Sequence, residues 1–346
     1  MKRYFLHGII LFFLLACGKD SKPEQQEYIT IGGLFPLTGE LCNEGIRALN
    51  GLQLARNVLN KKGGILGKQL DIIVLDDKND VQYAIEQYKA LKEKGVIAII
   101  GSSFPEVTQA LAEAAEKDSM PIISPMIVNP AKAKALASFA YNTLNARTAL
   151  ILDNSKYTST TNIFEEEFKL KGGKVLSRQR YSSPEAFETI LEEYKSNQPD
   201  IIFCPTHYIE AAQLVEATHK LGFENSKFIG TYAWEGILGL LHEYDMERVF
   251  YASPFMANDE EPDVKEFSQN FFESFNQMPM GTPAVTYSSV QILAAAIESS
   301  GSTNAKDIME AMKTVMPDVI AEPNPKIVYI MQVKNNIYSL FEKINL

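Results

Sequence analysis

Residues 63–77 read GGILGKQLDIIVLDD, a glycine-rich turn that leads into an apolar strand ending on two aspartates. We expect this strand over residues 70–75, between a helix over residues 43–59 and a second helix over residues 81–94. An apolar strand of this kind needs cover on both faces, which is typical of a parallel sheet. The stretch therefore predicts a βαβ unit in a doubly wound α/β sheet that extends from Ile29 to Pro125.

The alternation of strands and helices starts again after Pro125 and predicts a second α/β lobe. The expected helices cover residues 133–144, 159–170, 184–196 and 209–221, and the strands cover residues 148–152, 174–181, 200–204 and 227–231. Beyond Trp234 we expect a strand over 249–253, helices over 263–275, 283–299 and 305–315, and closing strands over 326–333 and 336–340. A chain of 346 residues is too long for one compact core and suits two lobes.

The amino terminus has the pattern of an export signal. Lys2 and Arg3 precede an apolar run over residues 9–15, which is too short to span a bilayer in the mature chain. The string Leu-Leu-Ala-Cys at residues 14–17 resembles the bacterial lipobox, which implies removal of residues 1–16 and a lipid on Cys17. Polar residues 18–27 are then expected to form a tether. The alternative is an uncleaved anchor that contains a cysteine by chance.

The net charge restricts the classes of binding partner, and the cysteine positions bear on disulfide formation. The net charge is −10, and loss of Lys2 and Arg3 with the signal makes it more negative, which disfavours nucleic acid and anionic lipid. No second hydrophobic stretch is long enough for a transmembrane helix. Cys42 and Cys204 lie in different predicted lobes, so we expect free thiols rather than a disulfide.

The sequence lacks the motifs of common enzymes. It has no Gly-x-Ser-x-Gly elbow, His-Glu-x-x-His pair, Walker-type loop or Cys-x-x-Cys pair. Cys204 and His207 offer only two metal ligands, which is too few for a site. The glycines at residues 63–67 follow a helix and precede a strand, the reverse of a dinucleotide-binding loop. We therefore expect a protein without catalysis, cofactor or metal.

Several stretches carry a resemblance to a known family. They are ITIGGLFPLTG at 29–39, NKKGGILGKQLDIIVLDDKND at 60–80, IIGSS at 99–103, PIISP at 121–125, LASFAYNTL at 136–144, ILDNSKY at 151–157 and TYSSVQILAAAIESSGS at 286–302. Together they resemble the branched-chain amino acid type of periplasmic solute-binding protein. The resemblance implies two lobes joined by three crossovers, with a ligand cleft between them that closes on a small molecule.

The resemblance also implies a division of the chain and a set of partners. Residues 28–126 and 251–322 are expected in lobe 1, and residues 127–250 and 323–346 in lobe 2. We expect a lipid-anchored, extracytoplasmic monomer that passes its ligand to an ABC permease. One departure concerns the first crossover, because Asn129 and Pro130 lead almost directly into the helix that opens lobe 2. A strand that the family has in this crossover is therefore expected to be missing.

A second departure concerns the ligand. In amino-acid binders of the family, a serine and a threonine hold the α-carboxylate and an acidic residue of the second lobe holds the α-ammonium. Matching positions place Pro105, Val128 and Tyr232 there. Proline and valine offer no side-chain hydrogen bond, and a neutral tyrosine brings no compensating charge. We therefore expect a ligand other than a standard α-amino acid.

The resemblance turns a largely aromatic set of side chains toward the cleft. The expected ligand-binding residues are Ser103, Phe104, Pro105, Val128, Tyr157, His207, Tyr232 and Trp234, with Ile127 beside them. Glu44 and Glu106 are expected near the cleft mouth, where they could meet a cationic group. Two functions stay open at this point: solute capture for an ABC importer, or a lipoprotein that keeps the two-lobed body as a sensor or protein-binding module.

Overall fold

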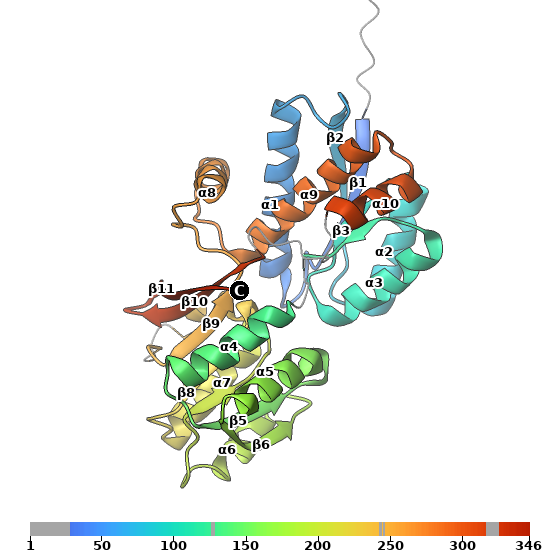
Figure 1. Ribbon diagram of the computed structural model, residues 1–346. Coiled ribbons are helices and arrows are strands. Elements are labelled where there is room, and N and C mark those ends of the chain that lie inside the picture. Colours follow the sequence, from blue (N-terminus) through green and yellow to red (C-terminus); the bar gives the residue numbers. More distant parts are fainter. Residues whose placement is uncertain (1–27, 126–128, 242–243, 245, 316–324) are drawn as a thin grey trace, which may run out of the picture.

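The computed structural model describes residues 28–125, 129–241, 244, 246–315 and 325–346. Residues 1–27, where the signal and tether are predicted, lie outside this part, as do Ile127 and Val128. The described chain forms two α/β lobes, one above the other in Figure 1. None of the helices in these ranges is both long and apolar enough to cross a bilayer.

Lobe 1 contains a parallel sheet of four strands in the order β2-β1-β3-β4. The strands are β1 (Tyr28–Phe35), β2 (Gln69–Asp76), β3 (Ile99–Gly101) and β4 (Ile122–Ile123). Helices α1 (Cys42–Lys61), α9 (Gly281–Ser300) and α10 (Ala305–Val315) pack on one face, and α2 (Val81–Glu93) and α3 (Pro105–Asp118) on the other. The doubly wound arrangement predicted from residues 63–77 is confirmed.

The glycine-rich turn sets the angle between α1 and β2. Gly64 has a positive φ, and a Cβ on it would lie 1.9 Å from the carbonyl oxygen of Lys68, so only glycine fits. Asn60 then joins the helix to the strand, because its amide donates to Leu70 O at 2.9 Å and accepts from Leu70 N at 2.7 Å. In contrast to our expectation of a strand covered on both faces, β2 is an edge strand, and most of its side chains are only half-buried.

Lobe 2 contains a sheet of seven strands in the order β11-β10-β9-β8-β7-β5-β6. The strands are β5 (Thr148–Asp153), β6 (Lys174–Arg180), β7 (Ile201–Phe203), β8 (Lys227–Gly230), β9 (Val249–Ser253), β10 (Ile327–Lys334) and β11 (Ile337–Asn345). Strands β5 to β9 pair in parallel, whereas β10 is antiparallel to both of its neighbours. Helices α4 (Pro130–Asn142) and α5 (Thr158–Leu170) cover one face, and α6 (Ala186–Glu192) and α7 (Tyr208–Leu221) the other.

The connections between the lobes differ from expectation at the second crossing. We predicted that residues from 251 onward belong to lobe 1, but Tyr251, Ala252 and Ser253 pair with β10 inside the sheet of lobe 2. The chain therefore leaves lobe 2 after Ser253 and continues to α8 (Pro262–Phe275), which packs on α1. At the first crossing, Asn129 caps α4 and no strand occurs between β4 and α4 in the part of the chain that the structure describes.

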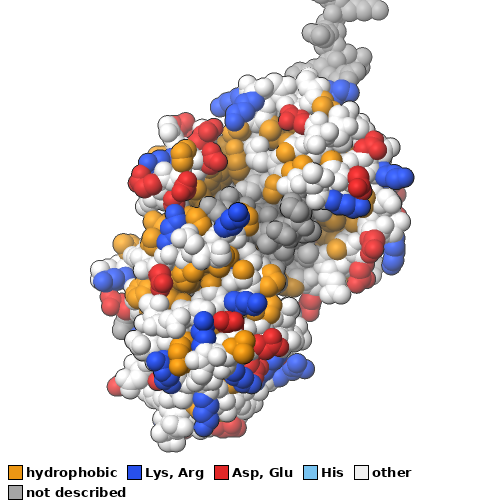
Figure 2. Space-filling model, viewed as in Figure 1, with side chains coloured by type: hydrophobic (Ala, Val, Ile, Leu, Met, Phe, Trp, Pro, Cys, Tyr) orange, Lys and Arg blue, Asp and Glu red, His pale blue; other side chains and the backbone are white. Residues whose placement is uncertain are grey.

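Both lobes carry charges of both signs over the face shown in Figure 2. Cys42 and Cys204 are free, as predicted. The segment after β9 is tied to lobe 2 at Asp259, whose carboxylate accepts from the Tyr329 hydroxyl and from Lys343 Nζ, each at 2.7 Å. These contacts fix the segment after β9 against the closing strands β10 and β11.

Candidate functional site

The candidate site lies between the lobes, beyond the carboxyl ends of the parallel strands. Ser103 follows β3, Tyr157 follows β5, His207 follows β7 and Tyr232 follows β8. Side chains from both lobes thus meet where open α/β sheets generally bind ligands. Two neighbouring cavities occupy this boundary, and we call them the smaller and the larger cavity.

The smaller cavity has a volume of about 20 Å³, which is room for a water-sized group. Its wall consists of Glu44, Ser103, Phe104, Pro125, Tyr157, His207, Tyr232, Ala233 and Thr282. The larger cavity measures about 150 Å³ and is lined by Pro105 and Glu106, among others. Phe104, Tyr157 and His207 line both cavities and form the partition between them.

Most of the predicted ligand-binding residues that the structure describes therefore meet at this boundary. Ser103, Phe104, Tyr157, His207 and Tyr232 line the smaller cavity, and Pro105 lines the larger one. Val128 lies outside the described residues, so its predicted role stays a prediction.

Trp234 does not line the cleft, and this prediction is wrong. Its ring is fully buried in the core of lobe 2, and its Nε1 donates to the carbonyl oxygen of Cys204 at 3.1 Å. A Cβ on Gly230 would lie 2.1 Å from this ring, which shows how closely the indole packs on β8. The short helical turn over Tyr232–Trp234 explains the error, because it directs Tyr232 to the cleft and Trp234 back into the core.

His207 is held at the amino end of α7 with its ring against aromatic neighbours. The ring centroid lies 5.4 Å from that of Phe104 in lobe 1 and 4.3 Å from that of Tyr208. Neither ring nitrogen has a hydrogen-bond partner among the described residues. Burial, with a further contribution from the charge on Arg47, lowers the pKa of His207 to about 3. The imidazole is therefore neutral near pH 7, with one donor and one acceptor unused.

Ser103 presents a second unpaired polar atom to the smaller cavity. Its side chain is 5 % exposed, and its hydroxyl has no partner among the described residues. The hydroxyls around it are occupied, since Ser102 donates to Asp77 at 2.6 Å, and Thr108 and Ser124 both donate to Ser102 O. Buried polar atoms without partners are uncommon in native proteins, so each calls for a water or a ligand.

Glu44 is part of the cavity wall rather than the cleft mouth where we expected it. Its carboxylate is buried and accepts hydrogen bonds from Thr282 Oγ1 at 2.9 Å and from Arg47. Burial raises the pKa of Glu44, although Arg47 opposes the shift. Glu106 is exposed and pairs with Lys156 of lobe 2 at 3.4 Å, so this ion pair joins the lobes at the surface.

The sequence analysis missed Glu235, a buried carboxylate that also joins the lobes. In lobe 2, Glu235 accepts from Ser253 Oγ at 2.5 Å, and across the boundary it accepts from the backbone N–H of Gly281 at 2.7 Å. Burial raises its pKa to about 7. The sequence could have indicated Glu235 as a site residue. It stands on the loop after β8, only three residues beyond Tyr232, which we matched to the acidic residue of the family.

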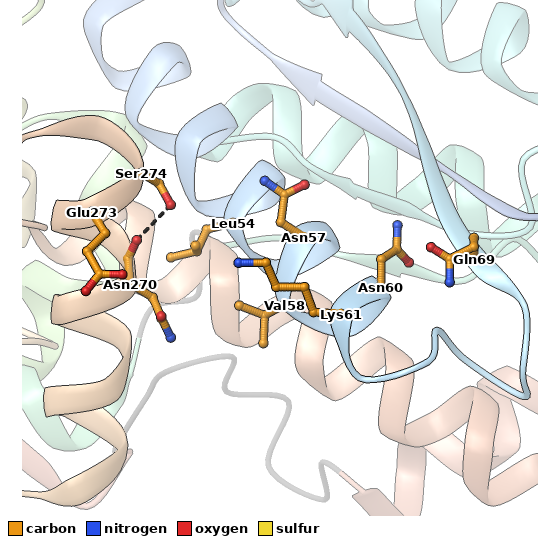
Figure 3. A pocket seen from close by; sticks show the side chains of 9 residues that line it. All are labelled: Leu54, Asn57, Val58, Asn60, Lys61, Gln69, Asn270, Glu273 and Ser274. Carbon is orange, nitrogen blue, oxygen red and sulfur yellow. Dashed lines mark hydrogen bonds between the residues drawn. The ribbon is translucent and has the colours of Figure 1, made fainter.

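A separate groove of about 560 Å³ lies in lobe 1 between α1 and α8. Figure 3 shows Asn270 and Ser274 of α8 opposite Leu54, Asn57 and Lys61 of α1. Several of its polar groups are already bonded within the protein, as with Asn60 to Leu70 and Ser274 Oγ to Asn270 O. The groove receives no residue from lobe 2 and is not part of the candidate site.

The described residues contain no group of three His, Cys, Asp or Glu side chains that could hold a metal ion. The site instead has the features of a binding cleft: two lobes, a buried boundary and unpaired polar groups on both sides. The fold and the site thus define a two-lobed ligand-binding protein. Residues 28–331 match the model of the periplasmic binding protein family, and the chain belongs to this family.

Known proteins support this assignment and the resemblance drawn from the sequence. The Leu/Ile/Val-binding protein BraC3 of Rhizobium johnstonii is 22 % identical over 326 residues, which cover 84 % of this chain and 83 % of that protein. The substrate-binding protein LivJ of Streptococcus pneumoniae, solved with isoleucine, has a TM-score of 0.81 at 21 % identity, covering 92 % of this chain and 100 % of that one. A solute-binding protein of Rhodopseudomonas palustris, solved with 3,4-dihydroxybenzoic acid, has a TM-score of 0.78 at 18 % identity and covers 92 % and 97 %.

Proposed function

We propose that this protein is a lipid-anchored, extracytoplasmic solute-binding protein that captures a small ligand between its lobes and delivers it to an ABC importer. The observation that carries the proposal is the pair of cavities enclosed by side chains of both lobes. A ligand bound there contacts both lobes at once and so favours the closed arrangement. Cys17 is the proposed site of lipidation, and residues 18–27 are the proposed tether. The protein would therefore act at the surface of the membrane.

The names of similar proteins support an ABC permease as the partner. The Streptococcus pneumoniae protein is described as the substrate-binding protein of a branched-chain amino acid transporter, and the Rhodopseudomonas palustris protein as the solute-binding protein of an ABC transporter. An ABC permease that accepts the closed form is therefore the partner we propose, with the protein acting as a monomer and without a cofactor.

We further propose that the ligand is apolar or aromatic rather than a standard α-amino acid. Phe104 and Tyr157, which line both cavities, provide apolar surface, and Tyr232 adds to it in the smaller cavity. The acid in its wall, Glu44, is already paired with Arg47 and Thr282, and Glu235 is bonded to Ser253 and Gly281. An α-ammonium group would therefore be buried without a free carboxylate, which costs more than the roughly 2–7 kcal/mol of an unpaired neutral polar group.

A thermal-shift screen against a metabolite library tests the proposal. A ligand that binds only the folded state raises the unfolding temperature with its concentration. We expect apolar or aromatic solutes to give such shifts, and Phe104→Ala to weaken them while the fold is retained. If no small molecule stabilises the protein, solute capture is ruled out. The small size of the smaller cavity would then favour the alternative of a sensor or protein-binding lipoprotein.

A further inference from the structure

Ser103 and His207, whose polar side-chain atoms have no partner among the described residues, face the same cavity from opposite lobes. We infer that the ligand carries an uncharged group that both donates and accepts hydrogen bonds, a hydroxyl or a carboxamide, and that Ser103 Oγ and the His207 ring bind this group together. The inference rests on the proposed function, because it names the ligand chemistry of the same site. It makes Ser103 and His207 the residues that determine specificity.

The volumes of the cavities match such a ligand in two parts. The smaller cavity, at about 20 Å³, holds one small polar group. The larger cavity, at about 150 Å³, equals in volume an apolar protein cavity that accepts benzene, and Phe104, Tyr157 and Ile209 supply its apolar surface. Because Phe104, Tyr157 and His207 line both cavities, a ring in the larger one can extend a polar group past them into the smaller one.

The charges around Ser103 and His207 disfavour an anionic group on the ligand. Glu44 stands in the wall of the smaller cavity, and Arg47 is paired with it. Among the described residues, the larger cavity is lined by the acids Glu40, Glu106 and Glu210 and by one cation, Lys156. A carboxylate would be removed from water beside these acids, and such a charge needs a partner that the site does not leave free.

Binding of a cationic group in the smaller cavity is also disfavoured. The one acid in the described wall of this cavity, Glu44, is already bonded to Arg47 and Thr282, and the Arg47 charge, which disfavours protonation of His207, would oppose a second cation. The neutral imidazole and the serine hydroxyl each supply a donor and an acceptor, which is the complement of a hydroxyl or a carboxamide. Neither group needs a compensating charge when it is buried, provided its hydrogen bonds are made.

Matched ring compounds test the inference by calorimetry on the full chain in detergent. The probes are benzyl alcohol, benzamide, benzoate, benzylamine and toluene, which share one ring and differ in the attached group. We expect benzyl alcohol or benzamide to bind at least about tenfold more tightly than benzoate, benzylamine and toluene. Tighter binding of either charged probe, equal binding of all probes, or no binding at millimolar concentration would overturn the inference. The proposed function is judged separately by the library screen.

Variants of Ser103 and His207 test whether these two side chains bind the polar group of the probe. Ser103→Ala and His207→Leu should each lower the affinity for the neutral polar probe about tenfold and leave toluene binding unchanged, because only hydrogen bonds are lost. His207→Gln, which keeps a donor and an acceptor, should restore most of the affinity. The control is His219→Leu on the same helix, since His219 also has an unpaired buried nitrogen but lies outside both cavities. An equal loss in the control, or no loss in Ser103→Ala and His207→Leu, would contradict the assignment.

Discussion

The carboxylates at the lobe boundary decide which ligands this cleft can take. Pro105 offers no side-chain donor, while Glu44 and Glu235 are both committed to protein partners. We predict that leucine, isoleucine and valine bind with dissociation constants no better than about 0.1 mM, because their charged groups would be buried without partners. Calorimetry measures this directly, and sub-micromolar binding of any of the three would refute the prediction.

The raised pKa of Glu235 leads to a prediction of how the stability of the protein depends on pH. Its pKa is raised by burial from 4.5 to about 7, so the folded state holds a proton that the unfolded state has released between these values. The stabilisation from this proton is complete below about pH 4.5 and is lost as the pH rises through about 7, a change of about 3 kcal/mol. Glu235→Gln should flatten this part of the pH profile.

The measurement is the free energy of unfolding in urea from about pH 5 to about pH 8. Other groups contribute to the profile, among them Glu44 and Asp77, whose pKa values burial also raises. The comparison with Glu235→Gln therefore isolates one residue. The exposed Glu224→Gln serves as the control and should keep the wild-type slope. Parallel profiles for the wild type and Glu235→Gln would show that Glu235 titrates normally.

At the scale of elements, the turn after β8 decides which aromatic side chain reaches the cleft. We predict that Gly230→Ala destabilises the protein by about 1–3 kcal/mol, because the added Cβ would lie 2.1 Å from the Trp234 ring and force the turn to move. Gly239→Ala is the matched control, since a Cβ there would meet nothing within 4 Å. Urea denaturation of both variants provides the comparison, and similar stabilities would argue against close packing at Gly230.

The sequence predicted the elements better than the directions of their side chains. Apolar strands and amphipathic helices follow from local periodicity. The family resemblance, which puts the ligand at the carboxyl ends of the parallel strands, was what placed Ser103 and His207 at the cleft. The turn over Tyr232–Trp234 has no such periodicity, and Trp234 was assigned to the wrong side. Glu235 was missed because its role depends on Gly281, which is 46 residues away in the chain.

For the whole molecule, the proposed anchor at Cys17 precedes the first described residue, Tyr28, in the sequence. We predict that Cys17→Ser leaves the two lobes folded but releases the protein from the membrane fraction, because lipid on Cys17 would be its attachment to the bilayer. Membrane fractions washed in high salt and probed by immunoblot test this. Retention of the variant in the washed membranes would contradict the lipobox assignment and favour an uncleaved apolar anchor.

The contacts between the two lobes differ in how much stability they contribute. The Glu106–Lys156 pair is exposed and contributes about 0–1 kcal/mol, whereas the bond from the Gly281 N–H to Glu235 is buried and lies at the amino end of the 20-residue helix α9. Loss of this bond leaves a buried N–H without its acceptor, at a cost of about 1–3 kcal/mol. The energy that holds the lobes together therefore lies mainly at the buried boundary.

We accordingly predict that Glu235→Ala shifts the ligand-free protein toward an open form, whereas Lys156→Ala does not. A change of about 1–3 kcal/mol multiplies the ratio of open to closed molecules by about 5 to 150. Small-angle X-ray scattering should show a larger radius of gyration for Glu235→Ala and an unchanged one for Lys156→Ala. A larger radius in Lys156→Ala alone would mean that the surface pair controls closure. Identical radii in all three proteins would mean that the buried bond does not control closure of the free protein.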